Sequence, residues 1–280
     1  MLNNQYGAFK TSTATGTDIS NGTSTAPGAK RTRRLYDSTA LQAVQDLASS
    51  FQGTLTNPAT VWSKLRFQNE ELNNDEEAVA WLEEVNRIMH VKFNESNFNT
   101  EIAKGYQSFV SMANMCLFVE DDNEGGFKFT ALHLANVAWT EGSDGVVDTV
   151  YRKFKLSARQ AIDIWGDKVH SSITKAMEHT PDKEFSFMHC IFPRDTKKVK
   201  LNNVGLAPGD KRPVASVYVD LDHKVQVEES GYYEMPVFVA RWSLMPNEKY
   251  GRGPAHLALP DTRTLNRLKQ RGLEAIDLQV

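Results

Sequence analysis

The spacing of hydrophobic residues changes along the chain, and these changes limit the folds that it can adopt. Between residues 39 and 113 apolar side chains recur every three or four positions, which is the spacing of amphipathic helices. From residue 116 they mostly alternate or form β-branched and aromatic runs, as strands do, and from Pro254 onward the helical spacing returns. This order predicts an α+β fold with antiparallel strands, because a parallel sheet would alternate strands and helices throughout.

Three helices are expected before residue 114. Asp37 or Ser38 caps the first, which Gly53 ends, and Asn74 or Asp75 caps the second. The apolar stripe of the first helix is expected to be buried and consists of Leu41, Val44, Leu47, Ala48 and Phe51. The apolar face of the second is also expected inside and consists of Ala78, Trp81, Leu82, Val85, Ile88, Met89 and Phe93. The third starts near Asn99.

Strands are expected over residues 116–120, 127–134, 137–140, 146–155, 184–192, 214–221, 224–229 and 237–244. Residues 142–145 have the composition of a hairpin turn. Two short helices interrupt the strands. A capping box of Ser157 and Gln160 starts the first, which Gly166 ends, and Asp167 is expected to cap the second.

The chain divides into three parts. Residues 1–30 are rich in Thr, Ser, Gly, Asn and Ala and are expected to form a flexible arm, because they have too few large apolar side chains to build a core. Residues 31–250 form the α+β part, and residues 251–280 form a long helix. A basic cluster, a possible contact patch for nucleic acid or an acidic partner, lies at the end of the arm and consists of Lys30, Arg31, Arg33 and Arg34.

Composition and motifs argue against several functions. The net charge of −3 is unlike that of a protein that grips nucleic acid over its whole surface. No apolar run approaches bilayer length, and the sequence lacks a P-loop, a dinucleotide-binding glycine motif, a zinc-protease motif and a serine-nucleophile motif. Cys116 and Cys190 have no metal-ligand spacing. We therefore expect no catalytic residue, no metal site and no cofactor.

Two local groups of polar residues could suggest chemistry, but each has a simpler structural interpretation. His189 and Cys190 are neighbours on a predicted strand, so their side chains point to opposite faces of the sheet. Asp220, Asp222 and His223 have a composition typical of a hairpin turn rather than of a metal site. An active site assembled from scattered residues remains open at this point.

The last helix carries two distinct faces. One is apolar, with Leu265, Leu268, Ala275 and Ile276, and Gly272 lies between them. The other is basic, because Arg263, Arg267 and Arg271 recur every four residues, with Gln270 and Glu274 beside them. An ordinary amphipathic surface helix would also show this pattern. The helix has no stop signal before Val280, so we expect the natural protein to continue.

Three segments together resemble one protein family. They comprise residues 33–41 (RRLYDSTAL) with 47–51 (LASSF) and 55–58 (LTNP), then 145–154 (GVVDTVYRKF), then 250–254 (YGRGP) with 258–266 (ALPDTRTLN). Their order and approximate spacing resemble the head-to-tail connecting, or portal, proteins of podoviruses such as the T7-like phages. Members of that family are longer and usually have a helical segment before the first motif, where this chain has its Ser/Thr/Gly-rich arm.

The resemblance implies a structural function. Portal proteins form a dodecameric ring at one capsid vertex, where they dock the terminase, contact capsid, scaffold and tail adaptor proteins, and let double-stranded DNA pass without sequence preference. By this map residues 31–250 are the wing and residues 251–280 begin the stem helix, so the portal fold is incomplete. The protein would be found in the virion, after assembly in the host cytoplasm, and would contact no membrane.

The resemblance also assigns expected roles to the last helix. Leu265, Leu268 and Ile276 would pack against a neighbouring stem, while the three arginines would face a neighbour or the channel. Two other functions remain as alternatives, namely a capsid-associated interaction protein that forms no ring and a nucleic-acid-processing enzyme.

Overall fold

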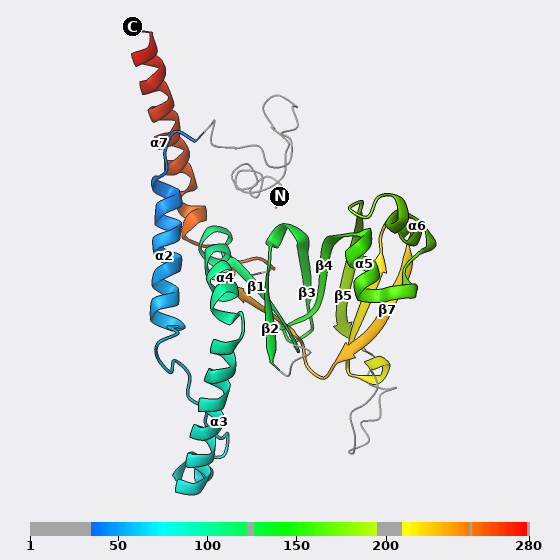
Figure 1. Cartoon of the computed structure of the whole chain (residues 1–280). Helices are drawn as coiled ribbons and strands as arrows, with labels where there is room; N and C mark the ends of the chain where they lie inside the picture. The colour runs from blue at the N-terminus through cyan, green and yellow to red at the C-terminus, as the bar shows by residue number, and fades with distance from the viewer. Residues whose placement is uncertain (1–34, 122–125, 195–208, 247, 279–280) are drawn as a thin grey trace.

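The computed structural model describes residues 35–121, 126–194, 209–246 and 248–278 (Figure 1). The arm of residues 1–30 and its basic cluster of Lys30, Arg31, Arg33 and Arg34 lie outside these ranges. Within them the chain combines helices with antiparallel sheets, so the predicted α+β class is confirmed. The main helices that precede the first strand are α2 (Thr39–Leu55), α3 (Glu76–Glu95) and α4 (Phe98–Met112).

Two antiparallel sheets follow. The smaller has the order β2-β1-β8 and consists of β1 (Asn114–Asp121), β2 (Phe127–Leu132) and β8 (Val237–Arg241). The larger has the order β3-β4-β5-β6-β7 and consists of β3 (Val137–Glu141), β4 (Val147–Ser157), β5 (Glu184–Pro193), β6 (Val214–Asp220) and β7 (Val225–Tyr232). Strands β3 to β7 are connected in sequence order, with α5 (Ala158–Trp165) and α6 (Ser171–His179) between β4 and β5.

Three groups of buried side chains hold these layers together. The first joins α2 and α4 to the smaller sheet through residues such as Ala48, Ile102 and Phe129. The second lies between the sheets and includes Phe118 and Ile191. The third packs α5 and α6 on the larger sheet and consists of Ala158, Ala161, Trp165, Val169, Ile173, Ala176, Phe185, Phe187 and Val227. Because burial of apolar area is the main stabilising term, these contacts fix the relative positions of the layers.

Side chains at the start of α4, including its cap residue Asn97, cover the outer edge of β2. Asn97 donates to the carbonyl of Phe129 and accepts from its backbone N–H, both at 2.8 Å, and the Glu101 carboxylate accepts from the N–H of Ala131 at 2.8 Å. Burial of Glu101 opposes its ionisation, but this hydrogen bond and the contact with Lys104 lower its pKa below the ordinary value. The edge strand therefore presents fewer open hydrogen-bonding groups to other chains.

Four local predictions were wrong for identifiable reasons. Gly53 lies inside α2, which continues to Leu55, and Leu41 is 47% exposed. The cap of α6 is His170, whose Nδ1 accepts from the N–H of Ser172 at 3.2 Å, so Asp167 does not cap this helix. Asp167 instead belongs to a short 3-10 turn between the two helices.

The fourth wrong prediction concerns the buried face of α3. Trp81 is 60% exposed, and the buried residues are the polar Asn86 and His90. Both bond to Ser63: the Ser63 hydroxyl lies 3.1 Å from Asn86 Oδ1 and 2.9 Å from His90 Nε2. A hydrogen-bonded polar face can be buried at little cost, and periodicity of apolar residues does not detect it.

Candidate functional site

The candidate functional site is α7 (Pro254–Asp277), which contains every residue of the predicted interface or channel set. None of its 24 residues is buried. The helix lies against α4 and passes Tyr36 and Asp37, which precede α2, and its C-terminal end projects beyond the rest of the described chain (Figure 1). Because no residue of this long helix is fully buried, it packs only partly on its own subunit, whereas most helices in proteins are stabilised by a buried face.

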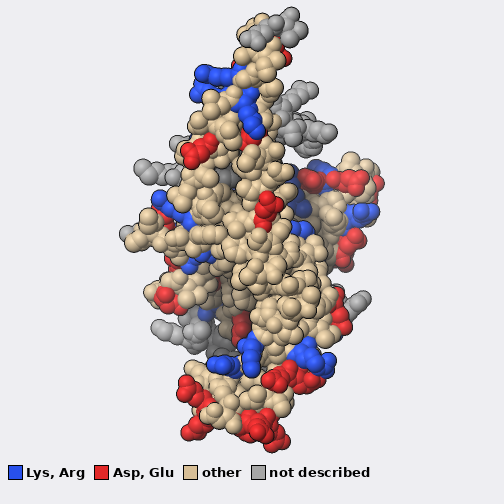
Figure 2. Space-filling model, turned by 90° about the vertical axis from the view of Figure 1, so that its left-hand side faces the viewer, with Lys and Arg blue, Asp and Glu red and all other residues tan. Residues whose placement is uncertain are grey.

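The predicted basic and apolar faces of α7 are both exposed. Arg263, Arg267 and Arg271 are exposed and lie on one flank, because they are four residues apart. Figure 2 shows Lys and Arg side chains gathered over α7, whereas the middle of the same face carries few charges. On the other side, Leu265 is 39% exposed and Leu268 is 62% exposed.

The remaining predicted residues lie near these faces. Ile276 is 59% exposed, so the apolar stripe does not pack on the subunit body. Gln270 is half-buried on the side of α7 that faces the body. Its amide donates to Glu274 of the same helix at 2.9 Å. Gln270 therefore has a partner within its own chain.

The segment just before α7, which we call its root, packs closely against the junction of α4 and β1. None of the predicted site residues belongs to it. Asn114 is 1% exposed, and its Oδ1 accepts from the N–H of Gly251 at 2.8 Å while its Nδ2 donates to the carbonyl of Met112 at 2.7 Å. A Cβ on Gly251 would lie 2.6 Å from the carbonyl oxygen of Ala113, and one on Gly253 would lie 2.8 Å from the Cβ of Ala113. The glycines of the YGRGP segment therefore allow the chain to pass against the junction of α4 and β1.

Aromatic residues complete this root. The rings of Trp139 and Tyr250 lie 4.4 Å apart, and Trp139 Nε1 donates to the carbonyl of Lys249 at 3.2 Å. Burial raises the pKa of Tyr250. These contacts anchor the segment before α7 to the larger sheet, so the direction in which the helix leaves the body is set by buried groups.

A second attachment of α7, also not predicted, lies further along the helix. Asn266 Oδ1 accepts from the backbone N–H groups of Tyr36 and Asp37, at 2.8 and 3.2 Å. Lys269 forms an ion pair with the carboxylate of Asp37, whose side chain is 1% exposed. The hydrogen bond from Lys269 lowers the pKa of Asp37, and that from Thr39 contributes as well. No sequence pattern links these positions, which are more than two hundred residues apart.

A buried polar row lies between the two sheets. The guanidinium of Arg152 lies 4.5 Å from the ring centre of Phe118 and 5.0 Å from that of Phe154. His189 is fully buried, with Nε2 2.8 Å from the Ser216 hydroxyl, and its burial and then the charge of Arg152 lower its pKa to about 3. A neutral, hydrogen-bonded histidine here is a core residue, as the alternation of β5 predicts.

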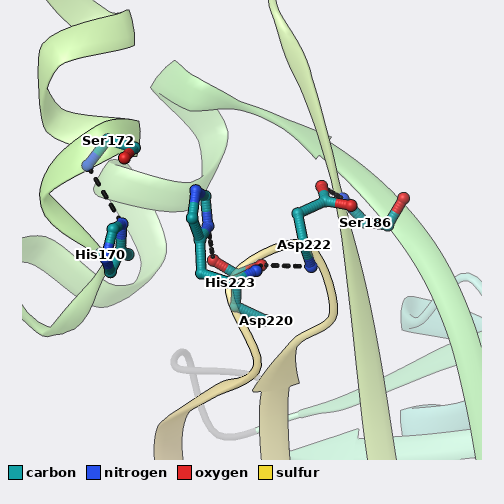
Figure 3. Close-up of polar contacts among 6 residues, drawn as sticks. All are labelled: His170, Ser172, Ser186, Asp220, Asp222 and His223. Carbon is teal, nitrogen blue, oxygen red and sulfur yellow. Dashed lines mark hydrogen bonds and ion pairs between the residues drawn. The ribbon is translucent and has the colours of Figure 1, made fainter.

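The Asp220, Asp222 and His223 group is a structured hairpin turn, as predicted (Figure 3). His223 Nδ1 lies 2.6 Å from the carboxylate of Asp220, which also accepts from the N–H of Asp222 at 2.9 Å. Asp222 in turn accepts from the N–H of Ser186 at 2.8 Å, and the rings of His170 and His223 stack at 4.1 Å. These bonds tie the turn to β5 and α6.

The described residues contain no group of three or more His, Cys, Asp or Glu side chains arranged to hold a metal ion. Within the same ranges no helix has the length and apolar character that a bilayer crossing requires. Just before β6, Arg212 donates to the carbonyl of Gly231 at 2.9 Å.

Comparisons with a family model and with known proteins both find bacteriophage connecting or portal proteins. The family model for "Bacteriophage head to tail connecting protein" matches residues 11–280. The chain is 27% identical over 256 residues to the "Probable portal protein" of Bordetella phage BPP-1, and equally to the "Portal protein" of Salmonella phage epsilon15. Each match covers 89% of this chain but 45% of the relative, so the chain spans less than half the length of these two proteins.

Proposed function

Because the chain belongs to the bacteriophage head to tail connecting protein family, we propose that it is a portal subunit that assembles into a ring at the capsid vertex. DNA would pass through this ring during packaging and ejection, and terminase, capsid, scaffold and tail adaptor proteins would dock on it. The function is structural and involves no catalysis, metal or cofactor. The observation that carries the proposal is α7, a 24-residue helix with an exposed apolar side and no buried residue.

The surface of the subunit supports lateral contact with a second copy. Exposed Leu268 and Ile276 on α7 would be covered by the neighbouring helix, since large exposed apolar surfaces mark interaction sites. The adjacent helix α2 contains one charged residue, Asp46, so its outer surface could approach another subunit without burying unpaired charge. In this arrangement residues 31–250 are the wing and residues 251–280 begin the stem.

The arginine flank of α7 is proposed to face either the channel or the adjacent subunit. Arg263, Arg267 and Arg271 follow one line of the helix, and a channel that lets DNA slide needs few such contacts because each adds to nonspecific affinity. If alanine at all three positions leaves both ring assembly and DNA packaging intact, this role is wrong.

Native mass spectrometry combined with negative-stain imaging tests the ring. We expect closed assemblies of about a dozen subunits, which the variant Leu268→Asn/Ile276→Asn should convert to monomers because it places amides in the contact between helices. Leu72→Asn, an exposed leucine remote from α7, is the matched control and should leave the mass unchanged. A monomer at every salt concentration would contradict ring formation by this chain and favour a capsid-associated protein, without affecting family membership.

A further inference from the structure

Helix α7 lies against α4, and hydrogen bonds hold it to the rest of the described chain at two separate places. The first is its root, where Asn114 holds Gly251 in a buried contact. The second is the clasp, which we define as Tyr36 and Asp37 together with Asn266 and Lys269 of α7. The two attachments differ in character, because the root is buried whereas the side chain of Lys269 is 50% exposed.

Pro260 lies between the root and the clasp. Pro260 has no N–H and therefore cannot donate the helical hydrogen bond to the carbonyl four residues earlier, and a proline ring also crowds that carbonyl. Such positions are where helices bend. The part of α7 after Pro260 is therefore joined to its first turn by a weakened segment of helix.

The clasp holds this distal part through polar contacts. Beyond Pro260, Asn266 Oδ1 accepts from the backbone N–H groups of Tyr36 and Asp37, and Lys269 donates to the Asp37 carboxylate. The Asp37 carboxylate is incompletely satisfied, since its Oδ2 is buried and makes no hydrogen bond. Opening the clasp would expose these groups to water, which can bond them all, so the closed state has only a modest advantage.

We propose that the distal half of α7 is a hinged lever that moves about Pro260, and that the clasp holds it against the start of α2. The contact joins the beginning of the described chain to the helix that projects from its end (Figure 1). Any partner that binds Tyr36 or Asp37 would thereby change the direction of α7. The lever is a property of the single chain and does not depend on ring formation.

Distance measurements between two spin labels test the lever. The labels replace Ala275 near the end of α7 and Ser49 on α2, both exposed, in a Cys190→Ser background. Native Cys116 stays unlabelled because burial raises the pKa of its thiol to about 12. Labelled chain is diluted into excess unlabelled chain, so that any oligomer contains a single labelled subunit.

The expected result is one narrow distance in the otherwise native chain. Asp37→Asn and Lys269→Met should each reduce the population at that distance at least about twofold and add longer distances, and the double variant should be no more open than either single variant. Lys175→Met on α6 is the matched control, because it removes an exposed cation outside the clasp and outside the proposed subunit contact, and it should behave as the native chain.

Two results would overturn the proposal. In the first, the clasp variants keep the native narrow distance, which would mean that α7 is rigid without the clasp. In the second, the native chain is already as broad as the variants, which would mean that the clasp does not hold it. Asp37→Asn keeps the shape of the side chain and Lys269 is half exposed, so neither variant should prevent folding, and circular dichroism verifies this.

Discussion

Replacement of Asn114 by alanine should destabilise the whole protein through the root of α7. The substitution removes two hydrogen bonds of 2.8 and 2.7 Å from a side chain that is 1% exposed. The N–H of Gly251 then has no partner in a buried position, which costs roughly 1–3 kcal/mol, and the carbonyl of Met112 loses its own bond. We expect a loss of about 2–4 kcal/mol in the free energy of unfolding.

Urea denaturation followed by tryptophan fluorescence measures this loss, and thermal melting should show a fall of about 5–15 °C for a protein of this size. Gln42→Ala, at an exposed position on α2, is the control and should change stability by less than about 0.5 kcal/mol. Asn114→Ala and Gly251→Ala should be less than additive when combined, because they disrupt one contact. A loss for Asn114→Ala as small as that of the control would refute the argument that this hydrogen bond anchors α7.

Three further outcomes are expected. Gly251→Ala alone should cost about 1–3 kcal/mol, because the new Cβ would lie 2.6 Å from the backbone oxygen of Ala113, and an unchanged melting temperature would show that the backbone relaxes freely. Because the pKa of His189 falls from 6.5 to about 3 on folding, the protein takes up a proton when it unfolds between these two pH values. The free energy of unfolding therefore decreases as the pH falls through this window, by about 4–5 kcal/mol at its lower end. His189→Phe should flatten that part of the curve of unfolding free energy against pH, and an equally steep curve would assign the acid sensitivity to other groups. Ser157→Ala should cost about 1 kcal/mol by removing the cap of α5, whereas Ser157→Thr should cost less; equal melting temperatures for the two would contradict the role of the hydroxyl.

The sequence predicted the caps and turns that depend only on residues close together in the chain. The capping box of Ser157 and Gln160 is present, Gly166 ends α5 with a φ of 56°, and the turn at residues 142–145 closes with Gly145 at a φ of 76°. These features depend on neighbouring residues alone. By contrast, α3 buries Asn86 and His90 because a distant segment containing Ser63 offers them hydrogen bonds, and no local pattern carries that information.

In the candidate site, too, some features follow from sequence spacing alone and others depend on tertiary contacts. Arg263, Arg267 and Arg271 lie on one flank of α7 because their spacing of four residues matches the helical repeat, which the sequence alone specifies. Their roles, and those of Leu265, Leu268, Gln270, Glu274 and Ile276, remain a proposal. The sequence marked the YGRGP segment as distinctive but did not predict its use, which is to fit against the backbone of Ala113.

The sequence by itself determined the α+β class, the long final helix and the family, since periodicity, capping residues and motif order are local properties of the chain. Only the tertiary structure decided that α7 is held at Asn114 and Asp37 and that its apolar side remains uncovered. Those contacts join residues more than a hundred positions apart, and their partners are chosen by how the layers pack rather than by any pattern within one segment.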